Sequence, residues 1–521
     1  MNMLEVLNAP ASTWVKETLG SLTLEEKIGQ LIFSRTYMPD IADSIKSGVV
    51  GNILVPTHTP PEKIAEYQKA AKVPLMICAD LENGGIFGKV NWPNALCLAG
   101  LPDDADLEDA AYKWAYYQGL QSRENGINSV FGPVFDIAMN PKSTTSGTRT
   151  LGATPQKVTE MAASVIKGFQ DSGLLPFAKH FPGFGRGEQD AHMELSLIEV
   201  DKETIIAEDI LPYIKAVNEA GLAGVMTGHI VAPEVDSELP LPLSSKIFNL
   251  LDEIGFKGLT VTDSLAMKGL TMEYSAYDRY VKSLAIGHDM LITDYFIRDT
   301  EGVALIKQGI ENGDFTEEAL NQRVERVLKM KEYLFGFKPA TYSTSDCEEF
   351  YYKVALDSIS SQTKDYSPLP ADGEVLFVVV SDEMDQVTGE VTFGTNDSDD
   401  MKVNITNVFP KAVIETLPAF PGPRAIEMLL HKSKSYEHVC FIVKTECRAY
   451  AGINSFSKPI LSLTSALRKK IHTLVSVGNP YAINELPEIK QVIVSCGGGA
   501  WIKALLSILN GSDSPKGNLP I

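Results

Sequence analysis

Ionisable side chains are concentrated in the stretch from Lys179 to His192, which reads KHFPGFGRGEQDAH. The stretch begins with a Lys-His pair and ends with an Asp-x-His pair, Asp190 and His192. Glycines and Pro182 between the two pairs prevent a continuous helix or strand, so we expect the second pair to lie on a flexible loop. The first pair, Lys179 with His180, ends the preceding apolar run LLPFA. Reactive groups are often presented on loops of this kind.

The elements that must position these groups alternate between short apolar runs and longer amphipathic ones. Between most of the short runs lie helical patterns such as EDAAYKWAYYQGLQSREN and PQKVTEMAASVIKGFQDSG. Eight β-α units over about 320 residues indicate an α/β fold with an N-terminal (β/α)8 TIM-type barrel, and a doubly wound sheet is the alternative. The candidate strands are KIGQLIF, VVGNILV, VPLMICAD, INSVFGPVFD, LLPFAKHF, LAGVMTGHI, GLTVTDS and DMLITD.

Polar side chains follow most of these candidate strands. Active sites in (β/α)8 barrels lie at the C-terminal ends of the strands, so independent segments are expected to bring ionisable groups to one mouth. One such residue is explained by capping of a strand end, but a whole set is harder to explain in that way. The residues are Asp80, Asp136, Lys179, His180, His229, Asp263 and Asp294.

A second domain is expected after the helical pattern FTEEALNQRVERVLKMKEYLFGF. We predict a barrel domain over residues 1–336, a linker over 337–347 that is rich in Pro, Ser and Thr, and a smaller C-terminal α/β sandwich domain over 348–521. Four hydrophobic strands are expected in the last domain: GEVLFVVVSDE, EHVCFIVKTE, KIHTLVSVGNP and IKQVIVSCGG. GGGAW at 497–501 lacks the P-loop lysine and the spaced dinucleotide glycines, so we interpret it as a packing turn.

Composition excludes several classes of function. The net charge of −21 argues against a nucleic-acid backbone or an anionic membrane surface as the main partner. The six cysteines are scattered, which is typical of buried free thiols rather than of a disulfide framework or a zinc site. The N-terminus resembles no secretory signal and no apolar run is long enough to span a membrane, so a cytoplasmic location is expected.

The KHFPGFGRGEQDAH segment resembles the fingerprint of the family 3 glycoside hydrolases, in their β-N-acetylglucosaminidase branch. That branch includes bacterial cytoplasmic enzymes of carbohydrate metabolism that act on peptidoglycan fragments, so the resemblance also implies peptidoglycan recycling. The end of the chain, from VGNPYAIN to the C-terminus, is similar to the C-terminal domain of two-domain members. Other motifs agree in order: SLTLEEKIGQLI, VPLMICADLENGG, GPVFDIAMNP, GTRTLGATPQKV, MTGHIVAPEVDSELPLPLS, GFKGLTVTDSLAM and AIGHDMLI.

The resemblance implies an exo-β-N-acetylglucosaminidase that hydrolyses terminal N-acetyl-β-D-glucosaminides with retention of configuration. Asp263, in VTDSLAM, matches the family's catalytic nucleophile and would form a covalent glycosyl-enzyme intermediate. His192 matches the acid/base group, whose ordinary pKa of about 6.5 suits proton transfer in both directions. Asp190 would orient the imidazole and stabilise its charged form.

Substrate-binding roles follow from the same matching. Asp80, Arg149, Lys179 and His180 correspond to positions that hydrogen-bond the sugar hydroxyls, whereas His229 and Asp289 serve either the sugar or the fold. No metal and no organic cofactor are implied, because the displacement needs only a nucleophile and proton transfer. The partner is a carbohydrate, and for the C-terminal domain we expect packing, formation of a homodimer or shaping of the aglycone site.

The chain departs from the family pattern at two places, and several alternative functions stay open. The run LENGGIFGKV after Asp80 lacks the arginine that the family commonly has there, and no proline follows His192 in MELSLIEV, so the substrate range is less defined than the reaction. An imidazole, unlike a carboxylate, would not repel a phosphate dianion, which makes a β-N-acetylglucosaminide phosphorylase the alternative. A β-glucosidase-type family 3 enzyme and a catalytically inactive carbohydrate-binding homologue are less favoured.

Overall fold

A computed structural model describes residues 1–521 of the protein except for residues 85–88, 144–146, 385–390, 394–395 and 446–454. The described chain divides into two compact units. The first contains Met1–Val90, Leu107–Ser146 and Ala153–Cys347, and the second contains Asn91–Asp106, Gly147–Gly152 and Glu348–Ile521. The contiguous domains 1–336 and 348–521 that were inferred from the sequence stay predictions.

The first unit is built on a single parallel sheet with the strand order β5-β4-β3-β2-β1-β11-β10-β8-β6. Its strands are almost entirely buried, as expected for parallel strands that helices cover. They are β1 (Ile32–Arg35), β2 (Asn52–Leu54), β3 (Met76–Ala79), β4 (Ser129–Val130), β5 (Leu175–Pro176), β6 (Ala178–Phe181), β8 (Gly224–Thr227), β10 (Leu259–Ser264) and β11 (Met290–Ile292).

The two ends of this sheet belong to one extended segment, Leu175–Phe181. Its first half, β5, pairs with β4, and its second half, β6, pairs with β8. Phe177 lies between the halves and contacts the rings of Phe33 and Phe131, with ring centroids 6.3 and 5.8 Å away. The sheet therefore closes through this segment. The (β/α)8 barrel expected from the sequence is confirmed, and the doubly wound alternative is wrong.

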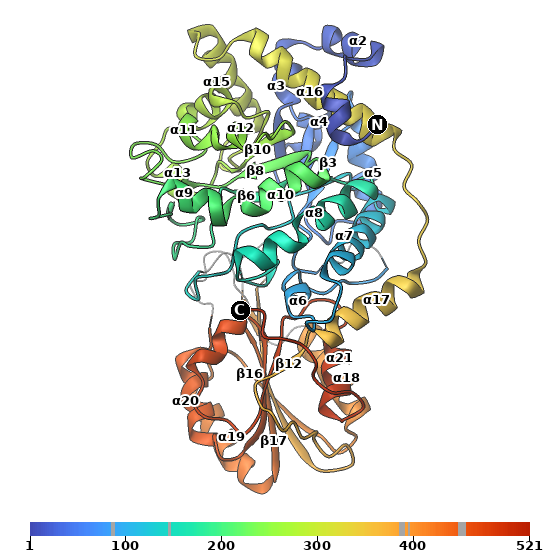
Figure 1. Cartoon of the computed structure of the whole chain (residues 1–521), viewed down its shortest axis with the longest axis vertical. Coiled ribbons are helices and arrows are strands. Elements are labelled where there is room, and N and C mark those ends of the chain that lie inside the picture. The colour runs from blue at the N-terminus through green and yellow to red at the C-terminus, as the bar shows by residue number, and fades with distance from the viewer. Residues whose placement is uncertain (85–88, 144–146, 385–390, 394–395, 446–454) are drawn as a thin grey trace. The chain divides into compact units, whose positions relative to one another are not determined.

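Amphipathic helices surround the barrel strands (Figure 1). In α8 (Pro155–Asp171), for example, Val158, Met161, Val165 and Phe169 recur on one face and are buried. The other larger helices of this unit are α1 (Met3–Asn8), α2 (Thr13–Ser21), α3 (Leu24–Gly29), α4 (Ile41–Ser47), α5 (Pro61–Ala70), α7 (Leu107–Glu124), α10 (Leu211–Ala220), α15 (Asp299–Asn312) and α16 (Glu317–Gly336). The unit also contains the short helices α9 (Lys202–Thr204), α11 (Ser245–Phe248), α12 (Leu250–Glu253), α13 (Lys268–Thr271) and α14 (Ser283–Ile286) and the small strands β7 (Ser196–Leu197) and β9 (Ile230–Val231).

The first candidate strand, KIGQLIF, is only partly a strand. Thr23 and Glu26 form a capping box that starts α3, and this helix extends to Gly29 before β1 begins at Ile32. The predicted linker also differs. Residues 337–343 form neither helix nor strand, but α17 (Thr344–Asp357) begins inside the range 337–347.

The second unit contains a six-stranded sheet with the order β12-β19-β18-β17-β13-β16. The four predicted strands are β13 (Val375–Val380), β17 (His438–Thr445), β18 (Ile471–Gly478) and β19 (Val492–Ser495), and all are parallel to their neighbours in this set. The prediction missed both edge strands, parallel β16 (Val413–Leu417) and antiparallel β12 (Ser360–Ser361). β14 (Asp382–Met384) and β15 (Val391–Phe393) form a separate antiparallel pair.

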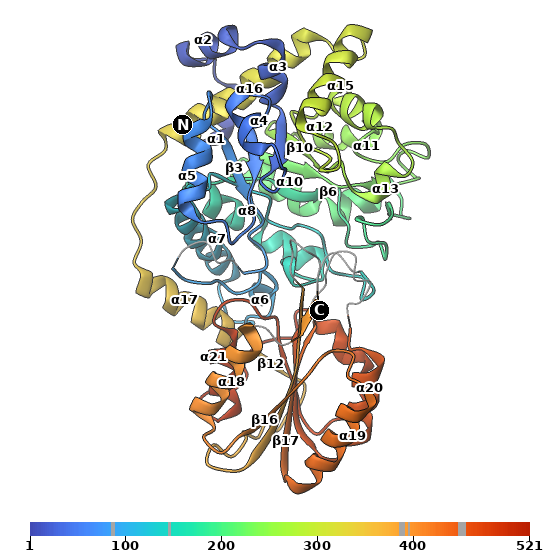
Figure 2. The ribbon, with the colours of Figure 1, turned by 180° about the vertical axis from the view of Figure 1, so that it is seen from behind.

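Helices cover both faces of this second sheet, as the two opposite views show (Figures 1 and 2). One face packs against α18 (Asn396–Val408) and α21 (Trp501–Leu509), and the other packs against α19 (Pro423–Lys432) and α20 (Lys458–Leu467). The C-terminal α/β sandwich is therefore confirmed. Its glycine turn packs closely on the segment that holds α6 (Leu96–Ala99), because a Cβ at Gly498 would lie 2.2 Å from Asn94 N.

Among the described helices, none is both long and apolar enough to cross a membrane.

Candidate active site

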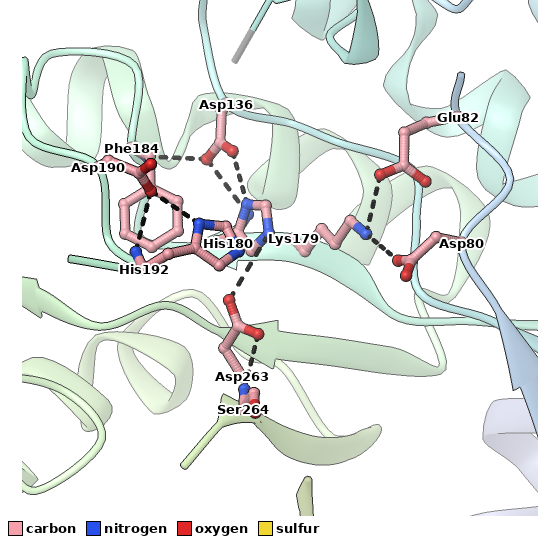
Figure 3. Close-up of polar contacts among 10 residues, drawn as sticks. All are labelled: Asp80, Glu82, Asp136, Lys179, His180, Phe184, Asp190, His192, Asp263 and Ser264. Carbon is pink, nitrogen blue, oxygen red and sulfur yellow. Dashed lines mark hydrogen bonds and ion pairs between the residues drawn. The ribbon is translucent and has the colours of Figure 1, made fainter. Parts of the chain in front are cut away.

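Four barrel strands bring the predicted site residues to one rim. Lys179 and His180 lie within β6, Asp263 lies near the end of β10, Asp80 directly follows β3, and His229 follows β8. Because parallel strands of a barrel all end at the same rim, side chains that are distant in sequence meet there. Figure 3 shows most of this group, together with residues that sequence reasoning did not assign.

Lys179 forms the first part of the site. Its ammonium group is almost fully buried and lies 2.6 Å from Asp80 Oδ1 and 3.1 Å from Glu82 Oε1. Asp80 is half-exposed, whereas Glu82 is buried. The two carboxylates compensate the charge of the buried ammonium, which would otherwise be costly. Sequence reasoning did not single out Glu82, although its place two residues after Asp80 in the same strand-end loop was the available signal.

His180 lies between two buried carboxylates (Figure 3). Its Nδ1 is 2.7 Å from Asp136 Oδ2, and its Nε2 is 3.8 Å from Asp263 Oδ2. Asp136 Oδ1 also accepts the backbone N–H groups of His180 and Phe184, at 3.2 and 2.8 Å. Burial tends to raise the pKa of Asp136, but attraction to His180 and these hydrogen bonds outweigh it and lower the pKa. Asp136 is therefore an ionised anchor for the imidazole.

Asp263 is a buried carboxylate that stays ionised. Its Oδ1 accepts the Ser264 N–H at 2.7 Å, while its Oδ2 is the oxygen nearer His180. Burial tends to raise the pKa of the carboxyl, but the attraction of His180 and His229 and the hydrogen bond from Ser264 lower it below the ordinary value. A carboxylate that stays charged at the end of a barrel strand can attack a carbon centre or stabilise a developing cation.

Asp190 and His192 form a hydrogen-bonded pair on the loop after β6. Asp190 Oδ1 lies 2.7 Å from His192 Nδ1 and also accepts the His192 backbone N–H at 2.9 Å. Asp190 is buried, whereas about a quarter of the His192 side chain is exposed, 26%. This arrangement fixes the orientation of the ring through its Nδ1.

The loop that carries this pair packs closely against its surroundings. A Cβ at Gly185 would lie 1.8 Å from the carbonyl oxygen of Ile137, and one at Gly187 would lie 2.2 Å from Ser196 Oγ. Arg186, between these glycines, pairs with Glu208 and with Asp209. These two glycines therefore have a packing function in the structure, in addition to the breaking of regular structure that the sequence indicated.

His229 is fully buried beside the site. Neither ring nitrogen has a hydrogen-bond partner of ordinary geometry within the described residues. Burial lowers the pKa of His229 to about 4, against the opposing attraction of Asp263, so the ring is neutral at neutral pH. A neutral imidazole with unused nitrogens next to Asp263 suits either contact with a ligand or support of the nucleophile.

Three other polar residues from the sequence are placed differently. Asp289 precedes β11, so it lies at the opposite rim, where it pairs with Arg326 at 2.9 Å; of the two roles that the sequence left open for it, this position favours support of the fold. Asp294 is buried against Arg279, with Oδ2 and Nη1 2.8 Å apart, which indicates a structural role. Arg149 ends the 3-10 turn Gly147–Arg149 of the second unit, and its sugar-binding role stays a prediction.

Within the described ranges, no three His, Cys, Asp or Glu side chains form a cluster that could hold a metal ion.

Comparisons with known proteins identify the family of the barrel. The model of the glycosyl hydrolase family 3 N-terminal domain matches residues 23–330. A β-N-acetylglucosaminidase/β-glucosidase of Cellulomonas fimi is 31% identical over 360 residues, which cover 64% of this chain and 62% of that protein. β-Hexosaminidase A of Pseudoalteromonas piscicida is 25% identical over 378 residues, which cover 66% of this chain and 63% of that protein. This chain thus spans less than two thirds of the length of either relative.

A solved structure is similar over nearly the whole chain. It is a glycoside hydrolase family 3 β-N-acetylglucosaminidase from Paenibacillus sp. str. FPU-7, with a TM-score of 0.85 and 25% identity. The match covers 96% of this chain and 99% of that one.

Proposed function

The chain belongs to glycoside hydrolase family 3, and on this basis we propose that it is a retaining exo-β-N-acetylglucosaminidase acting on a carbohydrate substrate. The observation that carries the proposal is the presence of two separate ionisable groups at one rim. One is the buried, ionised Asp263, and the other is the partly exposed imidazole of His192 held by Asp190. A retaining glycosidase needs such a pair, a nucleophile and a distinct proton donor.

In the first step, a carboxylate oxygen of Asp263 bonds to the anomeric carbon while the bond from that carbon to the leaving oxygen breaks. His192 gives its Nε2 proton to the leaving oxygen, and Asp190 stabilises the charged ring before transfer. In the second step, the neutral imidazole takes a proton from water, whose oxygen bonds to the anomeric carbon and releases Asp263. Two inversions give net retention of configuration.

Substrate binding is assigned to the groups around Lys179 and His180. Asp80 is half-exposed and can accept hydrogen bonds from two neighbouring hydroxyls, while Lys179 can donate to them. His180 is held by Asp136, and its Nε2 faces the nucleophile, which suits a hydroxyl next to the reacting carbon. Arg149 and His229 complete the proposed binding set. The terminal N-acetylglucosamine itself is proposed because the Cellulomonas and Paenibacillus proteins carry that activity in their names.

Hydrolysis of 4-nitrophenyl N-acetyl-β-D-glucosaminide tests this function, with the matching β-D-glucoside as the comparison. We expect turnover of the first substrate, and we expect Asp263→Ala to lower kcat by about a thousandfold or more. The control is Asp252→Ala, which removes an exposed carboxylate on α12. Proton NMR of the product should show the β-anomer first. Full activity of folded Asp263→Ala would remove the nucleophile assignment.

Phosphorolysis is the second candidate, favoured by the chemistry of the acid/base group. Because His192 is a neutral imidazole when the second step begins, the proposed acid/base group, unlike a carboxylate, would not repel an incoming phosphate dianion. Product analysis in the presence and absence of inorganic phosphate distinguishes the two reactions. N-acetylglucosamine 1-phosphate would form only in a phosphorylase, and free N-acetylglucosamine in both buffers indicates the hydrolase.

The cytoplasmic location, the role in peptidoglycan recycling and the formation of a homodimer are part of the proposal as expectations. Size-exclusion chromatography with light scattering measures the last of these directly.

A further inference from the structure

Aromatic side chains gather at the C-terminal ends of two neighbouring barrel strands. Tyr37 follows β1, and Tyr295 and Phe296 follow β11, which pairs with β1. Ring centroids are 6.0 Å apart for Tyr37 and Tyr295 and 4.8 Å apart for Tyr295 and Phe296. Tyr37 is 48% exposed and Phe296 is 69% exposed. A contiguous exposed aromatic surface on the rim that carries an active site indicates a contact surface for a ligand.

Two cations hold these rings in place. The Arg35 guanidinium lies 5.0 Å from the Tyr295 ring centroid and 5.9 Å from that of Tyr37. The Lys268 ammonium lies 4.2 Å from the Phe296 ring centroid. Cation–π contacts at these distances are attractive and restrict the motion of the rings. The aromatic surface is therefore preorganised before a ligand binds.

Lys268 also connects this surface to the proposed proton donor. Its backbone N–H donates to the carbonyl oxygen of His192 at 3.2 Å, while its side chain covers Phe296. A single residue thus joins the acid/base loop to the aromatic surface. Met193, the residue after His192, is also an exposed apolar residue, at 55%.

We propose that Tyr37, Tyr295 and Phe296 form a platform that binds the pyranose ring of the leaving group. The inference rests on the proposed function, because the group that protonates the glycosidic oxygen must lie on the leaving-group side of that bond. The surface joined to His192 through Lys268 is then the surface that the next sugar meets. The C–H groups of a pyranose face pack well against aromatic rings, and an exposed phenylalanine offers no competing hydrogen bond.

Two substrates that share the N-acetylglucosaminyl group but differ in the leaving group test the platform. N,N′-diacetylchitobiose has a sugar leaving group, whereas N-acetyl-β-D-glucosaminyl fluoride releases only fluoride. We expect Phe296→Ala to lower kcat/KM for chitobiose about tenfold and to leave kcat/KM for the fluoride unchanged. Phe296→Tyr should keep most of the activity on chitobiose. The matched control is Phe335→Ala, since Phe335 is another exposed phenylalanine, 44%, on α16.

Every outcome of this experiment decides the question. Equal effects of Phe296→Ala on the two substrates, or no effect on either, would overturn the platform, as would a wild-type enzyme that cleaves the fluoride but not chitobiose. A wild-type enzyme that cleaves neither substrate would instead overturn the proposed function. Tyr37→Ser provides the same comparison from the adjoining strand if Phe296→Ala does not fold.

Discussion

The imidazole of His180 is bound to the carboxylate of Asp136, with Nδ1 and Oδ2 2.7 Å apart and both side chains buried. A carboxylate accepts hydrogen bonds, so Nδ1 carries the hydrogen that is shared with it. The other ring nitrogen is thereby directed toward Asp263. The orientation of a residue next to the proposed nucleophile thus depends on a carboxylate that is not itself assigned to substrate or to the reaction.

Asp136→Asn is expected to disturb this orientation. The amide of the substituted side chain can present an N–H to Nδ1 instead of accepting from it, so the ring would change its tautomer or rotate. We expect kcat/KM to fall about a hundredfold, the effect of a misplaced group near the reacting atoms. Nitrogen-15 NMR of the imidazole reports the tautomer. A shifted tautomer signal together with unchanged kcat/KM would contradict the positioning role.

Asp190→Ala should impair proton transfer more than substrate binding. Without the carboxylate at 2.7 Å, the His192 ring loses both its orientation and the stabilisation of its charged form. We expect a loss of about 10² to 10⁴ in kcat/KM for a poor leaving group such as an alkyl glycoside. A good leaving group such as 2,4-dinitrophenolate needs little protonation, so the loss in kcat/KM for a substrate that carries it should be much smaller. Equal losses on the two substrates would argue against the dyad.

Glu82→Gln should weaken the environment of Lys179. The variant removes the charge of the buried one of the two described carboxylates beside the ammonium and keeps that of Asp80, which is half-exposed. We expect a loss of about 1–3 kcal/mol in the free energy of unfolding and a higher KM, measured by urea unfolding and steady-state kinetics. The control is Glu188→Gln, which breaks the exposed pair with Lys142 and should cost less than about 1 kcal/mol. Equal effects of the two variants would count against a special role for Glu82.

Gly185→Ala is expected to displace the acid/base loop. The added Cβ would lie 1.8 Å from the Ile137 carbonyl oxygen, so the backbone must move. We expect a destabilisation of about 1–3 kcal/mol and a loss of activity, measured by thermal unfolding and turnover. Gly20→Ala, in α2, is the control because no atom lies within 4 Å of its new Cβ; it should be neutral or slightly stabilising. An active, stable Gly185→Ala variant would show that the loop tolerates the shift.

Stability should fall as the pH is lowered, through two buried histidines of the barrel. Burial lowers the pKa of His288 to about 3 and that of His229 to about 4, whereas the unfolded chain has ordinary values near 6.5. The unfolded state therefore binds more protons below about pH 6.5. The stabilisation is present in full above that pH and declines by up to about 1.4 kcal/mol per pH unit and per histidine on the way to about pH 4.

His288 offers the cleaner test of this dependence, because its Nδ1 donates to Ser283 O and its Nε2 accepts from the Thr227 hydroxyl, each at 2.8 Å. The urea concentration at the midpoint of unfolding should decrease when the pH is lowered from about 7 to about 5. His288→Gln should make this decrease smaller. His58→Gln, at an exposed position, is the control and should leave the fall unchanged. A fall that His288→Gln leaves intact would assign the effect to other groups.

Local patterns were sufficient for the barrel and for the C-terminal sheet. Buried parallel strands are continuous apolar runs, so β3, β13 and β17 can be recognised in the sequence. Edge strand β16 was missed because it is only half-buried and its sequence, VIETL, includes a charged residue. The motif from Lys179 to His192 and the segment around Asp263 also sufficed to identify the family, because their residue types and order are short-range properties.

Contacts across the barrel were decided only by the tertiary structure. Asp136 with His180 and Glu82 with Lys179 are pairs that closure of the sheet brings together, and no spacing along the chain encodes such distances. The fold also places Asp263 and Asp289 at opposite rims of the barrel. Asp263 lies near the end of β10, whereas Asp289 lies just before the start of β11. The sequence determined which chemical groups the protein has and which strand carries each of them. The fold decided which groups meet, because hydrogen bonds and ion pairs form only between atoms that the closed barrel holds within a few ångströms of each other.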